Sequence, residues 1–341
     1  MSALVESIAL RCLTGDTDLS ALVELQNQRA RADAWEHVTS LAELRSDFQR
    51  PELNPAADVR LAMVGDTVLG FAALPISGPA TPWRRSLELQ SAVDAPVEVE
   101  QMLVQWSLQR AARLSAGDPG PVELLTFAPE PRVNRIGVLG SFGFEPVRRF
   151  VSLQCDLCSF SQHLSVPSRF AIRPLNGATE LPAWTAAVNE AFADHWRFSE
   201  LTMESAVHFL THDPSYQAGG DLVAVTPAGE IAGICQCVLR RTACEFRPPV
   251  EGAIAWLGVR PKFRGQGLGK ALLVSGLNWL AEHGVSSANL GVDADGAHAA
   301  LALYRQVGFK PVVYRHAFCW RSCTSLTSVA CSTSSHYLSP C

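Results

Sequence analysis

The sequence lacks any run of about eighteen apolar residues, the length expected of a transmembrane helix. Its start, MSALVESIALRCL, lacks both a basic segment and a long apolar core, so we expect no secretion signal and a cytoplasmic protein. Basic residues are not in excess, because 28 Lys and Arg stand against 33 Asp and Glu and give a net charge of −5. This balance disfavours nucleic acid as a partner, and without a long apolar run no membrane partner is expected. The remaining composition, 48% hydrophobic over 341 residues, is typical of a globular protein with two domains of about 150–170 residues.

The ten cysteines do not form a pattern that predicts disulfides or a metal site. Without an export signal, reduced and mostly buried thiols are expected. Cys155 and Cys158 form a C-x-x-C and Cys235 and Cys237 a C-x-C, but neither pair has a close second pair or a histidine in register. The other notable group lies in the Ser- and Thr-rich tail, residues 319–341, which has no hydrophobic period and is predicted to be disordered.

Three ordered pairs of similar segments indicate an internal repeat. LRCLTGDTDLSALVELQNQ, from Leu10, resembles IRPLNGATELPAWTAAVNE, from Ile172, at an offset of 172 − 10 = 162. VRLAMVGDTVLGFAAL resembles DLVAVTPAGEIAGICQC, and both are typical of a β-hairpin with a glycine-containing turn. GVLGSFGFEPVRRF resembles ALYRQVGFKPVVYRHAF, with Gly-Phe pairs at 143–144 and 308–309. Three matches in one order predict a tandem duplication.

We therefore expect two domains, residues 1–157 and 171–318, joined by a polar, proline-bearing linker at 158–170. Each half is predicted to run strand, helices, hairpin and longer strand, then helix, strand, helix, strand. In the second half the last five elements are expected as a strand at 253–259, a helix at 269–284, a strand at 286–293, a helix at 296–308 and a strand at 311–320. This order predicts an α/β fold, of the α+β type, with a mixed sheet and helices on both faces.

The stretch WLGVRPKFRGQGLGKALL, residues 256–273, joins a predicted strand to a predicted helix through alternating glycines. Unpaired N–H groups at a helix start, the helix dipole and glycines that allow close approach together form an anion site. The P-loop pattern does not fit, because Ala271 follows the Gly-Lys pair and Arg264 stands where its first glycine is needed. The dinucleotide fingerprint does not fit either, because its third glycine would be Lys270.

A third pattern fits. Arg264 to Gly269, R-G-Q-G-L-G, resembles the acyl-CoA-binding motif R/Q-x-x-G-x-G/A of the GNAT superfamily of N-acetyltransferases. Downstream, LYRQVGF resembles the other recurrent segment of that superfamily, a helix with a tyrosine followed by Gly-Phe. The resemblance covers residues 170–318 well and residues 8–153 as a faded copy, a tandem layout similar to that of mycothiol synthase relatives. It implies two tandem GNAT-like domains, each with a mixed, mostly antiparallel sheet flanked by helices, the C-terminal one catalytic.

The resemblance also implies acetyl-CoA as co-substrate and no metal. The N–H groups of Gln266 to Lys270 would bind its pyrophosphate, helped by the charge of Arg264. A backbone amide of the preceding strand, around Leu257 to Val259, would polarise the thioester carbonyl. The implied cofactor-binding residues are Leu257, Val259, Arg264, Gly265, Gln266, Gly267, Leu268, Gly269 and Lys270.

Two catalytic roles need candidates, a general acid and a general base. Tyr304 matches the tyrosine that the superfamily places near the CoA sulfur as general acid, although a helix tyrosine can also simply pack on the sheet. Relatives often carry an acid on the strand before the loop, where this chain has Ala253. The nearest carboxylate, Glu251, lies on the same strand face and is either a base acting through water or an exposed residue ending the hairpin. Asp194 and His195 are rival candidates.

The N-terminal half lacks this loop. Its corresponding segment, VDAPVEVEQMLVQW, has no glycine and carries Glu98 and Glu100 where phosphates would lie. Like charges at a few ångströms repel by about 1 kcal/mol or more. Leu139 also stands where the second half has Tyr304. We expect this half to bind CoA poorly and to act as a scaffold or as one wall of the acceptor pocket.

The leading hypothesis is an acetyl-CoA-dependent N-acetyltransferase that acts on a primary amine of a small molecule by direct attack in a ternary complex. A non-catalytic acyl-CoA-binding or regulatory module is the alternative that the missing strand carboxylate favours. A protein N-acetyltransferase is a third. The expected partner is a small-molecule amine, and the expected assembly is a monomer or a homodimer.

Overall fold

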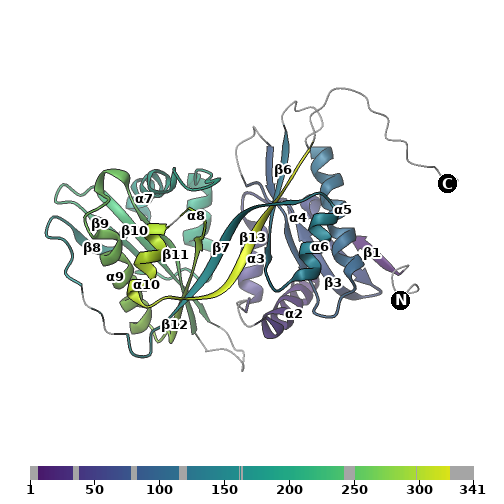
Figure 1. Ribbon diagram of the computed structural model, residues 1–341, viewed down its shortest axis with the longest axis horizontal. Helices are drawn as coiled ribbons and strands as arrows, with labels where there is room; N and C mark the ends of the chain where they lie inside the picture. The colour runs from purple at the N-terminus through teal and green to yellow at the C-terminus, as the bar shows by residue number, and fades with distance from the viewer. Residues whose placement is uncertain are drawn as a thin grey trace.

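The structure is a computed structural model that describes residues 7–33, 38–77, 83–114, 121–160, 162, 164–241, 250–296 and 298–322. It has two lobes, which follow the two halves of the sequence, and two long strands run between them (Figure 1). These strands are β7 (Glu145–Asp156) and β13 (Lys310–Arg321).

The two halves repeat one order of elements, as the sequence predicts. The first half contains β1 (Ile8–Arg11), α2 (Asp16–Ala32), α3 (Leu41–Gln49), α4 (Pro55–Asp58), β2 (Val59–Val64), β3 (Thr67–Ala73), β4 (Trp83–Ser86), β5 (Glu88–Ser91), α5 (Val97–Leu114), β6 (Val122–Pro129) and α6 (Val133–Ser141). The second contains β8 (Ala171–Pro174), α7 (Gly177–Phe192), α8 (Met203–His212), β9 (Asp221–Val225), β10 (Ile231–Arg241), β11 (Val250–Val259), a 3₁₀ turn (Pro261–Phe263), α9 (Leu268–Glu282), β12 (Ser287–Asp293) and α10 (His298–Val307). The five elements expected at the end of the second half are confirmed.

The first helix of each half begins in the same way, which is direct structural evidence of the duplication. Arg11 binds Asp18 at 2.5 Å, and Arg173 binds Glu180 at 2.6 Å, with both members of the second pair 162 residues after those of the first. Each carboxylate also accepts a backbone N–H before its helix, from Thr14 and from Asn176 respectively. The arginine bonds, with these N–H groups, lower the pKa of both acids to about 2.

The segment between the first two helices repeats as well. The amide side chain of Asn27 both donates to and accepts from the backbone of Thr39, and Asn189 does the same with Leu201. The next residue in each case caps the second helix, as Ser40 does for α3 and Thr202 for α8. These polar side chains make the same hydrogen bonds at positions 162 residues apart, which a repeat explains.

The two halves exchange their last strands. A nine-stranded sheet runs β4-β6-β13-β7-β12-β11-β10-β9-β8, and a four-stranded sheet runs β1-β2-β3-β5. Thus β7, from the first half, pairs antiparallel with β12, and β13, from the second half, pairs antiparallel with β6. The two exchanged strands also pair with each other. The predicted mixed, mostly antiparallel sheet flanked by helices is confirmed.

Each exchanged strand contributes buried residues to the core of the other half. Val151 and Leu153 of β7 are buried in the core of the second half beside α9, and Phe318 of β13 is buried in the core of the first half beside α5. Each half also has a smaller core on the other face, under α2 and α3 or under α7 and α8. Each lobe is therefore a sheet between two helix layers that is completed by a strand from the other lobe.

The predicted disordered tail begins too early. Cys319 to Arg321 belong to β13, where Cys319 is buried, and the backbone N–H of Ser322 donates to Val122 at 3.0 Å. Pairing with β6 continues the strand past the end of the hydrophobic pattern. The rest of that tail, residues 323–341, lies outside the described residues. Among the helices that the structure describes, none is long and apolar enough to cross a membrane.

Because each core contains a strand of the other half, the protein should unfold in one cooperative transition. Leu103 of α5 is fully buried in the core of the first lobe, so Leu103→Ala should lower the free energy of unfolding by about 2–5 kcal/mol. Hydrogen exchange should show the slowest amides of α9, in the other lobe, destabilised by a similar amount. Val133→Ala, at an exposed position of the same lobe, is the control. Separate melting of the two lobes would contradict this account.

Candidate active site

Strands β11 and β12 start as a parallel pair and then separate. Their register joins Gly252 to Ala288 and Ala253 to Asn289. A β-bulge follows at Ala255, because Gln236 and Cys237 of β10 face Trp256 and Ile254 across the ladder. A bulge bends its strand and increases the local twist. The result is an opening in the sheet between the second part of β11 and β12.

A cavity of about 600 Å³ occupies this opening. Its walls come from β11, β12, α10 and the end of α7, with Arg148 and Phe150 of the exchanged strand β7 on one side. Leu257, Val259 and Tyr304 line it, as the sequence predicts they should lie together. A methyl group on Gly258 would come within 2.7 Å of the Phe192 ring, so only glycine lets α7 approach this strand so closely.

The glycine loop follows Arg264, which lines the cavity, but Gly265 to Lys270 are not among the residues that line it. Gly265 and Gly267 have φ of 75° and 78°, in the left-handed region that favours glycine, and open space surrounds both. Helix α9 begins at Leu268 with Gly267 as N-cap, so the N–H groups of Leu268, Gly269 and Lys270 have no acceptor within the helix. The loop therefore has the geometry of an anion site at a helix N-terminus.

Arg264 has partners other than the one that the sequence predicts. Its guanidinium donates to Asp194 at 2.6 Å and to the carbonyl oxygens of Ala191 and Val259. These bonds hold the pKa of Asp194 below its usual range and fasten the glycine loop to the end of α7. A different cation stands beside the loop, because Arg169 donates to the side chain of Gln266 at 2.8 Å. No local sequence pattern marks Arg169, which lies 97 residues before its partner.

Tyr304 lies on α10 and is 8% exposed. Burial, together with the neighbouring Cys235, raises the pKa of its phenol to about 12, so the hydroxyl keeps its proton at neutral pH. The backbone N–H of Phe309 donates to the Tyr304 carbonyl at 3.0 Å, as that of Phe144 does to Leu139. Leu139 is thus the structural counterpart of Tyr304 in the first half, and it cannot supply a proton.

The candidate bases separate in space. His195 and Asp194 line the cavity, whereas Glu251 is buried in the paired part of β11, before the bulge, and is not among the residues that line it. Glu251 and Ala253 both precede the bulge, in the regularly paired part of β11, and neither lines the cavity. The structure therefore brings His195, and not Glu251, into one cavity with Tyr304.

The surroundings of His195 favour its neutral form. Its ring packs edge-on against Phe192, with centroids 4.5 Å apart. Burial lowers the pKa of His195, and this outweighs the opposing charges of Asp194 and Asp293; the charge of Arg264 lowers it further. A neutral imidazole near pH 7 can accept a proton.

The first half helps to hold this wall of the cavity. The Trp196 ring lies 5.8 Å from the ring of Phe150 on β7, and Arg148 of the same strand binds Asp293 at 2.8 Å. Arg197, with φ of 54°, is held in the left-handed region by an ion pair with Glu123 of β6 at 3.0 Å. Sequence reasoning missed these contacts because each joins residues far apart in the chain that only the strand exchange brings together.

Comparison with known proteins agrees with this geometry. Residues 182–309 match the Acetyltransferase (GNAT) family model. This segment belongs to the GNAT family. It contains the splayed strands, the glycine loop and Tyr304, and its counterpart in the first half has the same order of elements.

Relatives and solved structures extend the likeness beyond the GNAT segment. A mycothiol acetyltransferase from Renibacterium salmoninarum is 32% identical over 170 residues, which cover 49% of this chain and 49% of that protein. The chain thus spans about half the length of this curated relative. The structure of a GCN5-related N-acetyltransferase from Sphaerobacter thermophilus has a TM-score of 0.71 at 22% identity, and the match covers 93% of this chain and 96% of that chain. A tandem GNAT protein from the clavulanic acid biosynthesis pathway has a TM-score of 0.68 at 14% identity, with 94% and 99% covered. These two share the fold.

We expect the pKa of His195 to lie below the ordinary histidine value of about 6.5. Titration of ¹⁵N-histidine-labelled protein by NMR measures it, and His195→Gln assigns the signal. Because the charge of Asp194 raises this pKa, Asp194→Asn should lower it further. A midpoint at or above 6.5, or an upward shift in Asp194→Asn, would contradict the assignment.

Proposed function

We propose that this protein is an acetyl-CoA-dependent N-acetyltransferase that transfers an acetyl group to a primary amine of a small molecule by direct attack in a ternary complex. The observation that carries the proposal is the cavity between β11 and β12, which Tyr304, His195 and Arg264 all line, with the glycine-rich start of α9 following Arg264 in the chain. The relatives named mycothiol acetyltransferase support transfer to a small molecule.

The residues at the loop suit the pyrophosphate of acetyl-CoA. Gly265 and Gly267 leave open space where a side chain would otherwise stand, and the N–H groups from Gln266 to Lys270 surround the start of α9. Arg169, held by Gln266, and Lys270 add positive charge there, while Arg264 keeps the loop on α7. Leu257 and Val259 provide an apolar wall for the chain between pyrophosphate and thioester. Bound there, acetyl-CoA would supply the acetyl thioester.

The chain supplies three groups for the transfer. Among the described residues β11 pairs with β12 only as far as Ala253, so an N–H between Leu257 and Val259 is available to the carbonyl oxygen on which negative charge develops. As the amine nitrogen bonds to the carbonyl carbon and the carbon–sulfur bond breaks, Tyr304 donates its proton to the sulfur. His195 accepts the proton that the amine loses, because its lowered pKa keeps it neutral.

Enclosure of the cavity favours a small acceptor. The exchanged strand β7 closes one side with Arg148 and Phe150, and Trp196 packs against Phe150. Asp194 and Asp293 also line this end, but Arg264 and Arg148 neutralise them, so the end carries two ion pairs and no net charge. A protein segment would need a more open approach.

Tyr304→Phe removes the proposed proton donor and leaves the shape of the cavity unchanged. We expect kcat to fall about 100-fold, while the dissociation constant of acetyl-CoA stays within about twofold. A CoA-release assay over a panel of small primary amines measures the rate, and calorimetry measures binding. Tyr314→Phe, on β13, is the matched control.

The same assay tests the proposed function as a whole. Binding of acetyl-CoA without turnover of any amine would contradict enzymatic transfer and favour an acyl-CoA-binding module. A larger loss of rate in Glu251→Gln than in His195→Gln would indicate that Glu251, and not His195, is the general base.

Gly267→Asp should weaken acetyl-CoA binding more than tenfold. The carboxylate would stand beside the proposed pyrophosphate, and a residue other than glycine at φ 78° adds about 1–2 kcal/mol of strain. Gly229→Asp is the matched control, since Gly229 has φ of 81° and open space around it, but lies in the β9–β10 hairpin turn. Equal affinity in both variants, measured by calorimetry, would exclude the loop as the pyrophosphate site.

A further inference from the structure

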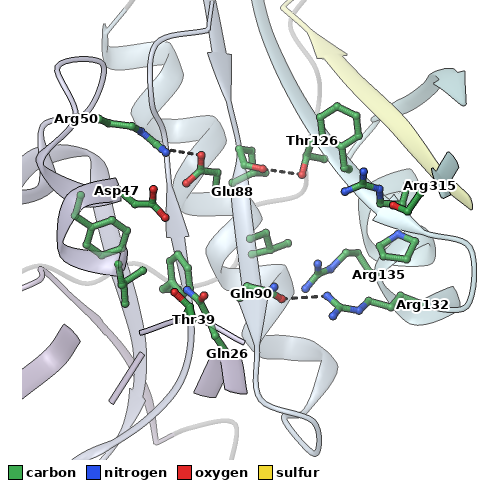
Figure 2. A pocket seen from close by; sticks show the side chains of 18 residues that line it. Gln26, Thr39, Asp47, Arg50, Glu88, Gln90, Thr126, Arg132, Arg135 and Arg315 are labelled. Carbon is green, nitrogen blue, oxygen red and sulfur yellow. Dashed lines mark hydrogen bonds and ion pairs between the residues drawn. The ribbon is translucent and has the colours of Figure 1, made fainter. Parts of the chain in front are cut away.

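A second cavity, of about 410 Å³, lies in the first half at the place equivalent to the first cavity (Figure 2). There β5 and β6 separate, as β11 and β12 do, because β5 joins the four-stranded sheet and β6 the nine-stranded one. Helices α2 and α3 close one side, and Ser152 of β7 and Arg315 of β13 reach it from the exchanged strands. Its size is that of a small-molecule site.

The route that CoA would take in this half is closed by the protein itself. Glu100 lies in the first turn of α5, which corresponds to the start of α9, and accepts hydrogen bonds from Ser91 at 2.7 Å and from Arg135 at 2.5 Å. Burial opposes ionisation of Glu100, but the charge and bonds of Arg135 outweigh it and hold the pKa of the carboxyl below its usual value. A carboxylate of the chain thus occupies the anion position, so an occupant of the cavity must be small.

The cavity has charged groups of opposite sign on its two sides. Figure 2 shows Asp47 and Arg50 on the α3 side and Arg132, Arg135 and Arg315 on the other, with Glu88 and Gln90 of β5 between them. The Glu88 carboxylate binds Arg50 at 2.6 Å. Opposite charges that face one cavity from two sides match a ligand with two charged ends.

Protein side chains hold the arginines of this cavity in position. Arg132 binds Asp33 at 2.6 Å and donates to the side chain of Gln90 at 3.0 Å. Arg135 is anchored by Glu100. A guanidinium has five N–H donors, so it can bind several acceptors at once, and pairing with Asp33 does not prevent Arg132 from binding a ligand carboxylate. Fixed guanidinium groups lose little side-chain entropy when they bind an anion.

We propose that this cavity binds a small, elongated molecule with an ammonium group at one end and a carboxylate at the other, the ammonium beside Asp47 and the carboxylate beside Arg132 and Arg315. A linear ω-amino acid or a short peptide has this chemistry. The site is separate from the cavity proposed for acetyl transfer, and its occupant is not a substrate of that reaction.

The surroundings of Asp47 support an ammonium partner. Asp47 reaches solvent through the cavity, yet enough protein surrounds it that burial raises its pKa to about 6. The nearby Arg50 opposes this rise, and the acids Glu88, Asp213 and Glu43 add to it. An ammonium group beside Asp47 would offset these negative charges. Binding of the ammonium end should therefore strengthen as the pH rises from 5 to 7 and Asp47 ionises.

The test is calorimetric titration of the full chain with 6-aminohexanoate, with hexanoate and hexylamine as probes that keep only one charged end. We expect saturable binding of 6-aminohexanoate at pH 7, at least tenfold tighter than that of either single-ended probe. Asp47→Asn should weaken it at least tenfold and remove its pH dependence, and Arg132→Gln should weaken it similarly. The controls Asp66→Asn and Arg113→Gln, at exposed positions outside the cavity, should leave it unchanged.

Three results would overturn the proposal: no saturable binding of 6-aminohexanoate, equal affinity for hexylamine, or unchanged affinity in Asp47→Asn. If Arg132→Gln unfolds because Asp33 loses the nearer of its two arginine partners, the result for Asp47→Asn decides the test alone. Acetyl-CoA binding, measured on the same samples, should be the same in Asp47→Asn as in the unmodified chain. Failure of the proposed acetyl transfer would leave these binding results unaffected.

Discussion

The antiparallel pairing of β7 with β13 is the contact on which the rest of the structure depends. Each of these strands leaves its own half and completes the sheet of the other, so neither core is whole without its partner. The pairing also builds both cavities, because β7 brings Arg148 and Phe150 to the first, and β13 brings Arg315 to the second. The duplicated halves are therefore one folding unit, and the chemistry of each cavity depends on residues of both.

The two cavities show how one architecture can diverge. Both lie where a central strand separates from its parallel neighbour in front of a helix start. In the second half, glycines leave the N–H groups of that helix open to an outside anion. In the first, Glu100 occupies the same position and is neutralised by Arg135. On the two proposals above, the loss of the glycines and the gain of this carboxylate change the ligand class from a long phosphorylated cofactor to a compact molecule.

Local features of the site could be predicted from the sequence, and long-range ones could not. The glycine loop, the helix with Tyr304 and the repeat each depend on residues close together in the sequence, so motif spacing could predict them. The exchange of β7 and β13 leaves no such trace, because alternating residues fit any neighbouring strand. The bulge at Ala255 was equally hidden, and so was the turn after α7 that brings His195 into the cavity with Tyr304. Arg264 kept its predicted place in the loop, but its bond to Asp194 depends on how α7 ends.

The central claim is that two equivalent openings exist and that only the second one takes the cofactor. Hydrogen–deuterium exchange of the full chain with and without acetyl-CoA tests it most directly. The account predicts slower exchange in residues 257–270 and 299–304, and no change in residues 88–104, where Glu100 closes the equivalent path. Protection of residues 88–104 by acetyl-CoA, or no protection of the glycine loop, would contradict it.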